Sequence, residues 1–350
     1  MLDKWFKKES PLLNMIGFGG GAANRLTGFK IPPIEATGGT TNTDGGFKYH
    51  IYTVDTPSPT LNLAVTFAPD DATIELLVIG GGGGAAWNNG GGGGAGGIAY
   101  APALPVAAAT YPVTVGTGGT GTNNYLMSGS PQLKGNNSTF THPVGTITGL
   151  GGAGPYTIDS LTEVAGPGQP FHSKIAPGGS GAGTRRSGTR NPTYRPGIAA
   201  AQPTQPNFGA GVLHYGNNGG DVDQTQQYTG AGGGGAGGTG FDYNESVFQP
   251  SRGRGGAGQP FTGFPAPAVA PGIPSPNQPA FTPAVTPTGL YGGGGGGSSE
   301  NKAPGGSTGG TGGGGGAGSP GVYGTGGGGG SADTTGLNGG AGLVVLRYPV

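Results

Sequence analysis

Cysteine is absent from this sequence of 350 residues, and charged residues are scarce. Without thiols the chain can form neither disulfides nor thiolate metal sites, so cysteine usage says nothing about its redox compartment. Only 9% of the residues are charged, and 16 basic residues balance 16 acidic ones. Because a protein that neutralises phosphates carries a basic excess, we expect no nucleic-acid partner. No apolar run is long enough to cross a bilayer, so we also expect no membrane span.

Hydrophobic residues are few as well, at 32% of the chain, whereas glycine and proline number 87 and 32. So many helix-breaking residues exclude a helical enzyme, and the apolar core must be thin. The glycines gather in tracts that have no fixed period, which disfavours a collagen helix. The tracts cover residues 90–97, 178–183, 230–240, 292–297, 305–318 and 324–330. Flexible linkers would have the same composition; we favour ordered tracts that are held together by their main chains.

Alternating apolar residues predict β-strands in the first part of the chain. The alternation runs from Tyr49 to Val54 and again from Leu61 to Phe67, and we expect His50 to face solvent. The next strand, Thr73–Ile79, is almost continuously apolar, so both of its faces should be covered. Further strands are predicted at residues 98–100, 111–115, 138–140, 145–148 and 343–348.

The last of these strands lies far in sequence from its expected partners. A sandwich assembled from both ends of the chain, with glycine-rich material looped out between them, explains this order best. We therefore predict an all-β fold, a small antiparallel β-sandwich of jelly-roll type. The expected parts are residues 1–34 as an anchor, 35–150 as sandwich strands with the first tracts, 151–338 as a glycine- and proline-rich bundle with loops, and 339–350 as the returning strand. Residues 184–206 and 261–287 are expected to be loops.

Polyglycine has one ordered conformation that suits such inserts. The extended threefold helix has no internal hydrogen bonds, so every N–H and C=O points outward and needs a partner. Neighbouring tracts that pack as polyglycine-II-type helices can supply those partners, because missing side chains let the main chains approach closely. Each net hydrogen bond contributes only about 0.5–1.5 kcal/mol, while ordering glycine is costly, so we expect the sandwich to fix the tract ends.

The first 34 residues differ from the rest of the chain. A short amphipathic turn with lysines on its polar face ends before Pro11, and an apolar stretch follows. We interpret this segment as an anchor that docks on a partner surface; a signal peptide, or a peptide folded back on its own domain, are the alternatives. The apolar anchor residues are Leu2, Trp5, Phe6, Leu12, Leu13, Met15, Ile16 and Phe18.

Arginine and aromatic residues punctuate the middle of the chain. Tyrosine among glycine, serine and asparagine is typical of recognition loops, because a rigid ring supplies contact area at low entropic cost. The alternative is that these side chains cover the glycine bundle or touch neighbouring subunits, with cation–π contacts. The candidate contact residues are Arg185, Arg186, Arg190, Tyr194, Arg195, Tyr215, Tyr228, Phe241, Tyr243 and Phe248.

No catalytic or cofactor motif stands out from this background. Spaced glycines are expected by chance in a chain so rich in glycine, and none of the matches opens a helix. The histidines His50, His142, His172 and His214 have no paired ligand spacing, so we expect no metal and no cofactor. Asp221 and Asp223, after Asn217 and Asn218, could offer oxygen ligands to calcium, but a polar turn is the simpler interpretation.

The order of these pieces resembles the glycine-rich structural proteins of tailed bacteriophages. The resemblance is carried by the blocks FKYHIYT at 47–53, LLVIGGGGG at 76–84, GGGGGAGGIAY at 90–100, YPVTVG at 111–116, GNNSTFTHPVGTITGLGG at 135–152 and GGAGLVVLRYP at 339–349. It implies a non-enzymatic virion component, a tail fibre or adhesin part. The proline-rich insertion at 265–287 and the particular N-terminal peptide depart from that pattern. From the anchor at residues 1–34 we expect attachment to other virion proteins, as a homo-oligomer or in multiple copies, and from the aromatic loops we expect contact with a host cell-surface glycan or protein. A capsid decoration protein or head fibre is the chief alternative, and a non-viral ice-binding or cell-wall glycine protein is the next.

Overall fold

Residues 34–350 form one compact unit, distinct from residues 1–33. Within it the computed structural model describes residues 34–54, 60–68, 72–87, 90–122, 133–154, 179–186, 211–222, 229–243, 252–298, 307–332 and 335–350. The described part is mostly β-structure, and every paired strand in it runs antiparallel to its neighbour. The all-β prediction is therefore confirmed at the level of class and strand direction.

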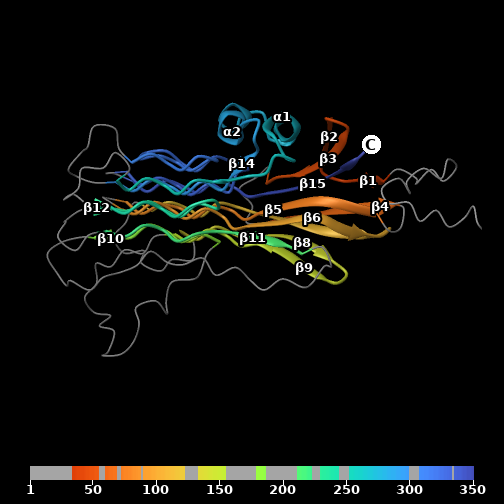
Figure 1. Cartoon of the computed structure of the whole chain (residues 1–350). Coiled ribbons are helices and arrows are strands. Elements are labelled where there is room, and N and C mark those ends of the chain that lie inside the picture. Colours follow the sequence, from red (N-terminus) through yellow and green to blue (C-terminus); the bar gives the residue numbers. More distant parts are fainter. Residues whose placement is uncertain are drawn as a thin grey trace, which may run out of the picture. The chain divides into compact units, whose positions relative to one another are not determined.

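Two sheets make up the β-structure core (Figure 1). The six-stranded sheet has the order β11 (Leu213–Tyr215), β6 (Ile98–Val106), β5 (Ala72–Ile79), β15 (Leu343–Pro349), β3 (Phe47–Tyr52), β2 (Thr40–Asp44). The five-stranded sheet has the order β1 (Glu35–Thr37), β4 (Thr60–Ala68), β7 (Thr110–Gly116), β8 (Ser138–His142), β9 (Gly145–Gly149). Two short pairs lie outside these sheets: β10 (Arg185–Arg186) with β12 (Thr229–Gly230), and β13 (Gln259–Pro260) with β14 (Leu290–Tyr291).

The two ends of the chain meet in the six-stranded sheet, as expected. β15 lies between β3 and β5, with Val345 opposite Ile51 on one side and Leu77 on the other. The strand-forming residues are Val and Leu in an unbroken run, and all four residues from Leu343 to Leu346 are fully buried. The predicted strands are present, several of them longer than predicted; the sequence patterns did not indicate β1 or β2.

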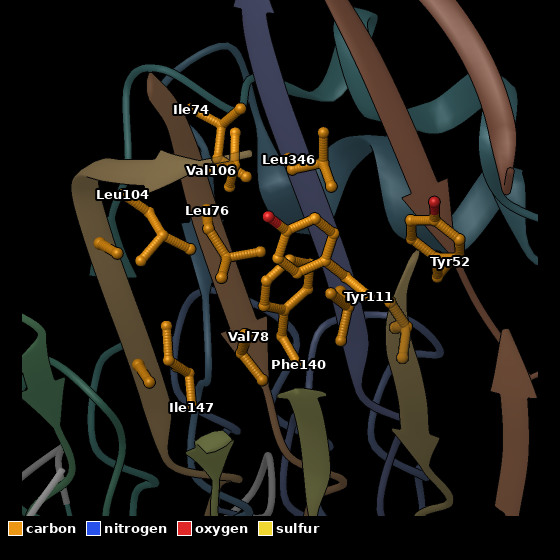
Figure 2. Packing of buried hydrophobic residues seen from close by; sticks show 14 of the residues in the cluster. Tyr52, Ile74, Leu76, Val78, Leu104, Val106, Tyr111, Phe140, Ile147 and Leu346 are labelled. Atoms are coloured by element: carbon orange, nitrogen blue, oxygen red, sulfur yellow. The ribbon is translucent and has the colours of Figure 1, made fainter. Parts of the chain in front are cut away.

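The first hydrophobic core fills the space between the two sheets. Alternate residues of β5, namely Ile74, Leu76 and Val78, point into it and meet side chains from the other sheet. Figure 2 shows Tyr111, Phe140 and Ile147 reaching this core from β7, β8 and β9. Tyr111 and Phe140 stack with ring centroids 5.4 Å apart. Leu77 and Ile79 of β5 face the opposite side of the sheet, together with Glu75.

That opposite face is covered by the insertion after β13, which corrects the expectation of a loop at 261–287. The segment folds into α1 (Ala266–Val269), the 3-10 turn η3 (Ala270–Gly272) and α2 (Gln278–Val285), shown above the sheet in Figure 1. Prolines stand at the first helical positions, where no N–H is needed. Phe264, Val269 and Phe281 are buried against Leu77, Ile79 and Val345. The proline-rich composition of this segment gave no indication that it would form a second hydrophobic core.

An ion pair set among aromatic rings joins this insertion to the sheet. The Arg347 guanidinium pairs with Glu75, directly opposite it across β15 and β5. The guanidinium lies 4.1 Å from the ring centroid of Phe47 and 5.5 Å from that of Phe264. A Cβ atom at Gly263 would come within 2.6 Å of the guanidinium, so the missing side chain lets the insertion cross close to it. Arg347 therefore fastens the helical cover through packing as well as charge.

His50 lies in the interior, not at the surface as its strand pattern suggested. Its side chain is fully buried and stacks on Tyr348, with ring centroids 5.7 Å apart. Nδ1 lies 2.8 Å from the Gly38 carbonyl oxygen, and Nε2 lies 3.1 Å from the Tyr348 hydroxyl. Because a carbonyl only accepts, Nδ1 carries the proton, and Nε2 of the neutral ring accepts from the hydroxyl. The strand pattern could not predict this burial, because the partner Tyr348 is 298 residues away in sequence.

Burial of His50 makes the stability of the fold pH-dependent. Burial lowers the pKa of the imidazole below 6.5; the Gly38 carbonyl acts in the opposite direction and Lys48 adds to the lowering. The unfolded chain thus takes up the proton at a higher pH than the folded chain. We expect the free energy of unfolding to be at its full value above pH 6.5 and to fall as the pH drops below it.

Denaturant titrations above and below pH 6.5 measure this difference. In His50→Gln the difference should shrink without vanishing, because burial also lowers the pKa of His214. Val144→Ala, at an exposed side chain that does not titrate, serves as the control and should leave the pH dependence unchanged. An unchanged pH dependence in His50→Gln would contradict the assignment.

The second core predicts a large effect of shortening a helix residue. Phe281→Ala empties a fully buried site beneath α2 and should lower the free energy of unfolding by about 3–5 kcal/mol. Val144→Ala, at a side chain that is 60% exposed, should change it by no more than about 0.5 kcal/mol. Equal, small effects of both substitutions in denaturant titrations would show that the insertion is not part of the core.

Candidate functional site

The glycine tracts continue the strands of both sheets and run side by side beyond them (Figure 1). Residues 80–86 follow β5, residues 117–122 follow β7, and residues 90–97 lead into β6. Where the apolar side chains stop, each main chain exchanges its two sheet partners for a larger number of neighbours. The result is a bundle of main chains, called the tract bundle below.

The N–H groups of residues 80–86 donate to three different tracts in strict rotation. Every third donor goes to the same neighbour, at N···O distances of 2.8–3.4 Å. The pairs are Gly80–Gly97, Gly83–Gly94 and Ala86–Gly91; Gly81–Asn136 and Gly84–Leu133; Gly82–Gly340 and Ala85–Leu337. The period of this tract is therefore three residues, unlike the period of two in the strand that it continues.

The carbonyl groups of the same tract accept from three further tracts. The donors are Gly152 to Gly81, Gly119 to Gly82, Gly329 to Gly83 and Thr122 to Ala85. Adjacent neighbours also bond to each other, as in Gly135 to Gly152 and Gly340 to Gly327. Residues 80–86 thus lie inside a closed ring of six bonded tracts.

The same arrangement repeats around the next interior tracts. In residues 90–97 the donors rotate among residues 231–234, 326–329 and 150–153. In residues 229–236, Gly230, Gly233 and Ala236 donate to one neighbour, residues 292–298, again every third residue. The interior tracts consist almost entirely of glycine and alanine.

Close approach explains why glycine fills the interior. A Cβ atom built on Gly82, Gly93 or Gly295 would lie 2.0, 2.1 or 2.0 Å from a carbonyl oxygen of the next tract. No real Cβ atom tolerates such a contact, so each of these positions excludes every other residue type. The bundle therefore has an interior made of main chain, with no side-chain chemistry.

The outer tracts carry side chains, and these follow the same period of three. Residues three apart lie on the same side of such a tract and reach solvent together. Exposed or partly exposed pairs are Thr117 with Thr120, Lys134 with Asn137, Asn218 with Asp221, Thr239 with Asp242, Arg254 with Ala257, Thr308 with Thr311, and Thr335 with Asn338. The signal was in the sequence, as spacings such as T-G-G-T and N-G-G-D, but it could be interpreted only once the threefold period was known.

Four outer tracts border residues 229–236, which run from Ala236, in the second hydrophobic core, to β12 at the end of the bundle remote from the sheets (Figure 1). Consecutive neighbours are joined by hydrogen bonds, from Thr184 N to Gly220 O, Tyr243 N to Asp221 O, and Phe241 N to Arg254 O, at 3.1, 2.8 and 2.9 Å. The tracts 179–186, 217–222, 238–243 and 252–258 therefore follow one another around this end. They bring together the charged and aromatic residues that the sequence leaves scattered.

Phe241, Tyr243, Arg252 and Arg254 form the core of this region, called the arginine–aromatic surface below. The Arg254 guanidinium lies 6.0 Å from the ring centroid of Phe241, and that of Arg252 lies 6.0 Å from the ring centroid of Tyr243. Phe241 is 42% exposed, whereas Tyr243 is buried. The hydroxyl of Ser307 donates to the Arg252 carbonyl at 2.9 Å and helps to fix the turn that presents both arginines.

The candidate contact residues thus separate into three groups. Phe241 and Tyr243 lie on the arginine–aromatic surface, whereas the main chain of Arg185 and Arg186 forms β10 and pairs with Gly230 and Thr229. Tyr215 lies elsewhere, on edge strand β11, where its ring packs edge-on against Phe261 with centroids 5.3 Å apart. Arg190, Tyr194, Arg195, Tyr228 and Phe248 lie outside the described residues. The same holds for every anchor residue: Leu2, Trp5, Phe6, Leu12, Leu13, Met15, Ile16 and Phe18.

The residues considered for calcium serve the bundle where the structure describes them. The Asn217 side-chain amide donates to the carbonyls of Gly235 and Ala236 at 2.9 and 3.0 Å. The Asp221 N–H donates to Asp242 Oδ1 at 2.7 Å. Asp223 and His172 lie outside the described residues. Among the residues that the structure describes, no three His, Cys, Asp or Glu side chains come together in a way that could hold a metal ion, and no helix is long and apolar enough to span a bilayer.

Comparison with known proteins adds one match. The model of a family described as a glycine-rich domain matches residues 58–349. That range contains all of the tracts described above and most of the strands of both sheets. No curated protein matches the chain.

Interior and outer glycines should respond oppositely to the same substitution. Gly93→Ala would place a Cβ atom 2.1 Å from the Gly83 carbonyl oxygen and should lower the free energy of unfolding by about 3 kcal/mol or more. In Gly316→Ala the nearest atom is 3.5 Å away, and alanine loses less entropy on folding, so we expect a gain of up to about 1 kcal/mol. Denaturant titrations test both variants. If Gly93→Ala were as stable as Gly316→Ala, the tracts would not be packed as described.

Proposed function

The chain belongs to the glycine-rich domain family, and from this we propose that it is a non-enzymatic structural protein whose tract bundle is a rigid support for an exposed contact surface. The proposal has three parts: the conformation of the tracts, the surface that they carry, and the particle to which the protein belongs. A different observation supports each part.

For the conformation, we propose that the tracts are polyglycine-II-type helices. That helix has three residues per turn and a rise of about 3.1 Å per residue, with all hydrogen bonds made to other chains. The rotation of donors among three neighbours in residues 80–86 and 90–97 supports this conformation. So does the pairing of exposed side chains three residues apart. The jelly-roll type of the two-sheet core is the corresponding proposal for the sheets.

For the surface, an interior of bare main chain leaves only the outer tracts and the connections for recognition. The described residues on both sides of segments 223–228, 244–251 and 299–306 lie at the end of the bundle remote from the sheets. In sequence these segments contain Asp, Gln, Tyr, Asn, Glu, Phe and Lys, which the interior tracts lack. This division of composition favours a support with a recognition end.

For the particle, we propose a bacteriophage tail fibre or appendage subunit that is anchored by residues 1–34 and contacts the host surface. The order of the sequence blocks between residues 47 and 349 supports this assignment through its resemblance to glycine-rich phage structural proteins. The chief alternative, a capsid decoration protein or head fibre, would use the same residues. The ice-binding alternative calls for regularly spaced rows of exposed threonine, and the threonine positions in this sequence are irregular.

Labelling of purified particles with an antibody against the full chain, followed by cryo-electron microscopy, tests the assignment. We expect label on the tail, with dozens of copies or fewer per particle. Label over the capsid in hundreds of copies would select the decoration protein instead. Absence of the chain from purified particles would overturn the virion assignment altogether. Unlabelled particles from the same preparation, treated with an unrelated antibody, provide the control.

A further inference from the structure

Three outer tracts that follow one another in the sequence run in the same direction. Residues 150–154 continue β9 and residues 217–222 continue β11, so both lead away from the sheets. Residues 179–184 lie between them and share their direction, because the hydrogen bonds on both sides of this tract advance in the same sense. The bonds are Ser180 N to Ala95 O and Gly183 N to Gly92 O, beside Gly97 N to Leu150 O and Gly94 N to Ala153 O, and then Gly181 N to Asn217 O and Thr184 N to Gly220 O. All three tracts therefore start at the sheets and end remote from them.

Two connections of the chain must return along the bundle as a result. Residues 155–178 start at the remote end of the first tract and finish at the sheet end of the second, and residues 187–210 make the same return to the third. Neighbours that run antiparallel need only a short turn, whereas parallel neighbours need a crossover of about a dozen residues or more. Each return has 24 residues, from 155 to 178 and from 187 to 210. The connections 223–228 and 244–251, which join antiparallel tracts, have six and eight.

The first two of these tracts lie on the exterior of the bundle. Residues 80–86 are bonded to six tracts, whereas residues 150–154 and 179–184 are each bonded to four of the described tracts. The neighbours of 150–154 are 80–86, 90–97, 133–137 and 179–184, and those of 179–184 are 90–97, 150–154, 217–222 and 229–236. One side of both tracts thus has no bonded neighbour among the described residues. This side is called the side wall below.

The side wall is nevertheless buried. Ala153, Ser180 and Ala182 are 1%, 0% and 2% exposed, while the outer tracts on either side reach solvent through Asn137 and Asn218. The Ser180 hydroxyl is buried and has no hydrogen-bond partner among the described residues. Because buried polar groups are normally paired, this hydroxyl indicates that a further part of a chain belongs on the side wall.

The two returning connections have the length and the composition to cover the side wall. A tract of six residues in the threefold conformation is about 19 Å long, and an extended chain spans that distance with about six residues. Each connection therefore has far more chain than the return itself requires. The connections also contain large apolar residues, which the interior tracts lack; these are Tyr156, Ile158, Leu161, Val164, Phe171 and Ile175 in the first, and Tyr194, Ile198 and Phe208 in the second.

We infer that residues 155–178 and 187–210 pack against the side wall, so that this side of the bundle is covered by the protein's own chain. A second copy of the chain is the alternative cover. The width of the buried strip favours the connections, because it is confined to the two tracts whose ends residues 155–178 join. A stable interface between copies would extend over the neighbouring tracts as well.

This cover restricts where other molecules can meet the bundle. It assigns the candidate contact residues Arg190, Tyr194 and Arg195, which belong to the second connection, to the side of the bundle. The opposite side and the remote end are then the surfaces left for a partner. The inference does not depend on the particle to which the protein belongs.

The absence of cysteine from the chain allows a test with single introduced thiols. Ala153→Cys and Ala182→Cys place a thiol on the side wall, and Ala257→Cys places one at an exposed position of an outer tract as the control. In the full chain, diluted until light scattering shows a monomer, a maleimide should react with either side-wall thiol at least about tenfold more slowly than with the control thiol. Equal rates would overturn the inference. Slow reaction that appears only when light scattering shows a dimer would assign the cover to a second copy instead.

Variants of the connections identify the cover. Ile158→Ser combined with Leu161→Ser in the first connection, and Phe208→Ser in the second, should each accelerate labelling of a side-wall thiol by about tenfold, because they weaken apolar packing. Val247→Ser combined with Phe248→Ser makes the same kind of change in residues 244–251 and should leave the labelling rate unchanged. Thermal unfolding shows that each variant is folded, and either connection suffices if a variant of the other does not fold. Labelling that stays slow in the folded connection variants, or that accelerates equally in the remote-end control, would overturn the inference.

Discussion

Hydrogen bonds between bare main chains are the interaction on which the rest of this structure depends. In the interior of the tract bundle the N–H groups donate to some neighbouring tracts and the carbonyls accept from others, so that seven residues from Gly80 to Ala86 reach six tracts. Each bond has a small net value, about 0.5–1.5 kcal/mol, and ordering a glycine costs more entropy than ordering any other residue. The balance becomes favourable because no side chain holds the interior tracts apart, so that their N–H and C=O groups can bond to one another.

The two sheets solve the problem that the tracts cannot solve alone. A free polyglycine segment would have to find six neighbours at once. Residues 80–86 follow β5 directly, and the pairing of that strand up to Ile79 already fixes their direction and register. The sheets in turn need more apolar contact than two thin faces supply. The helical insertion provides it, by covering the outer face of the six-stranded sheet and fastening to it through Arg347 and Phe264.

Function is pushed to the outside by the same constraint. Where a Cβ atom would approach a neighbouring carbonyl to about 2 Å, no functional side chain can be placed, so the interior tracts are chemically silent. Among the described tracts, side chains that could contact a partner stand at the outward residue of every third position, such as Asp242 and Arg254. Such a body can change its contact residues without disturbing what holds it together, because the two sets of positions do not overlap.

The sequence alone determined the class of the fold, the main strands and the importance of the glycine main chain. Period-two alternation from Tyr49 to Val54, and the continuous apolar run before Gly80, are local signals that need no partner to be interpreted. Only the tertiary structure decided the rest. The Pro-rich residues 261–287 contain helices because a compact helical segment can bury its apolar side chains against the otherwise uncovered face of β5 and β15. The His50 side chain faces the interior because Tyr348 and the Gly38 carbonyl provide its hydrogen-bond partners there. Phe241 and Arg254 are thirteen positions apart in sequence. They lie next to each other because a main-chain hydrogen bond between these two residues joins their tracts. Contacts of this kind depend on which neighbours a tract acquires in three dimensions, and a glycine tract, having no side chains, carries no mark of that choice in its sequence.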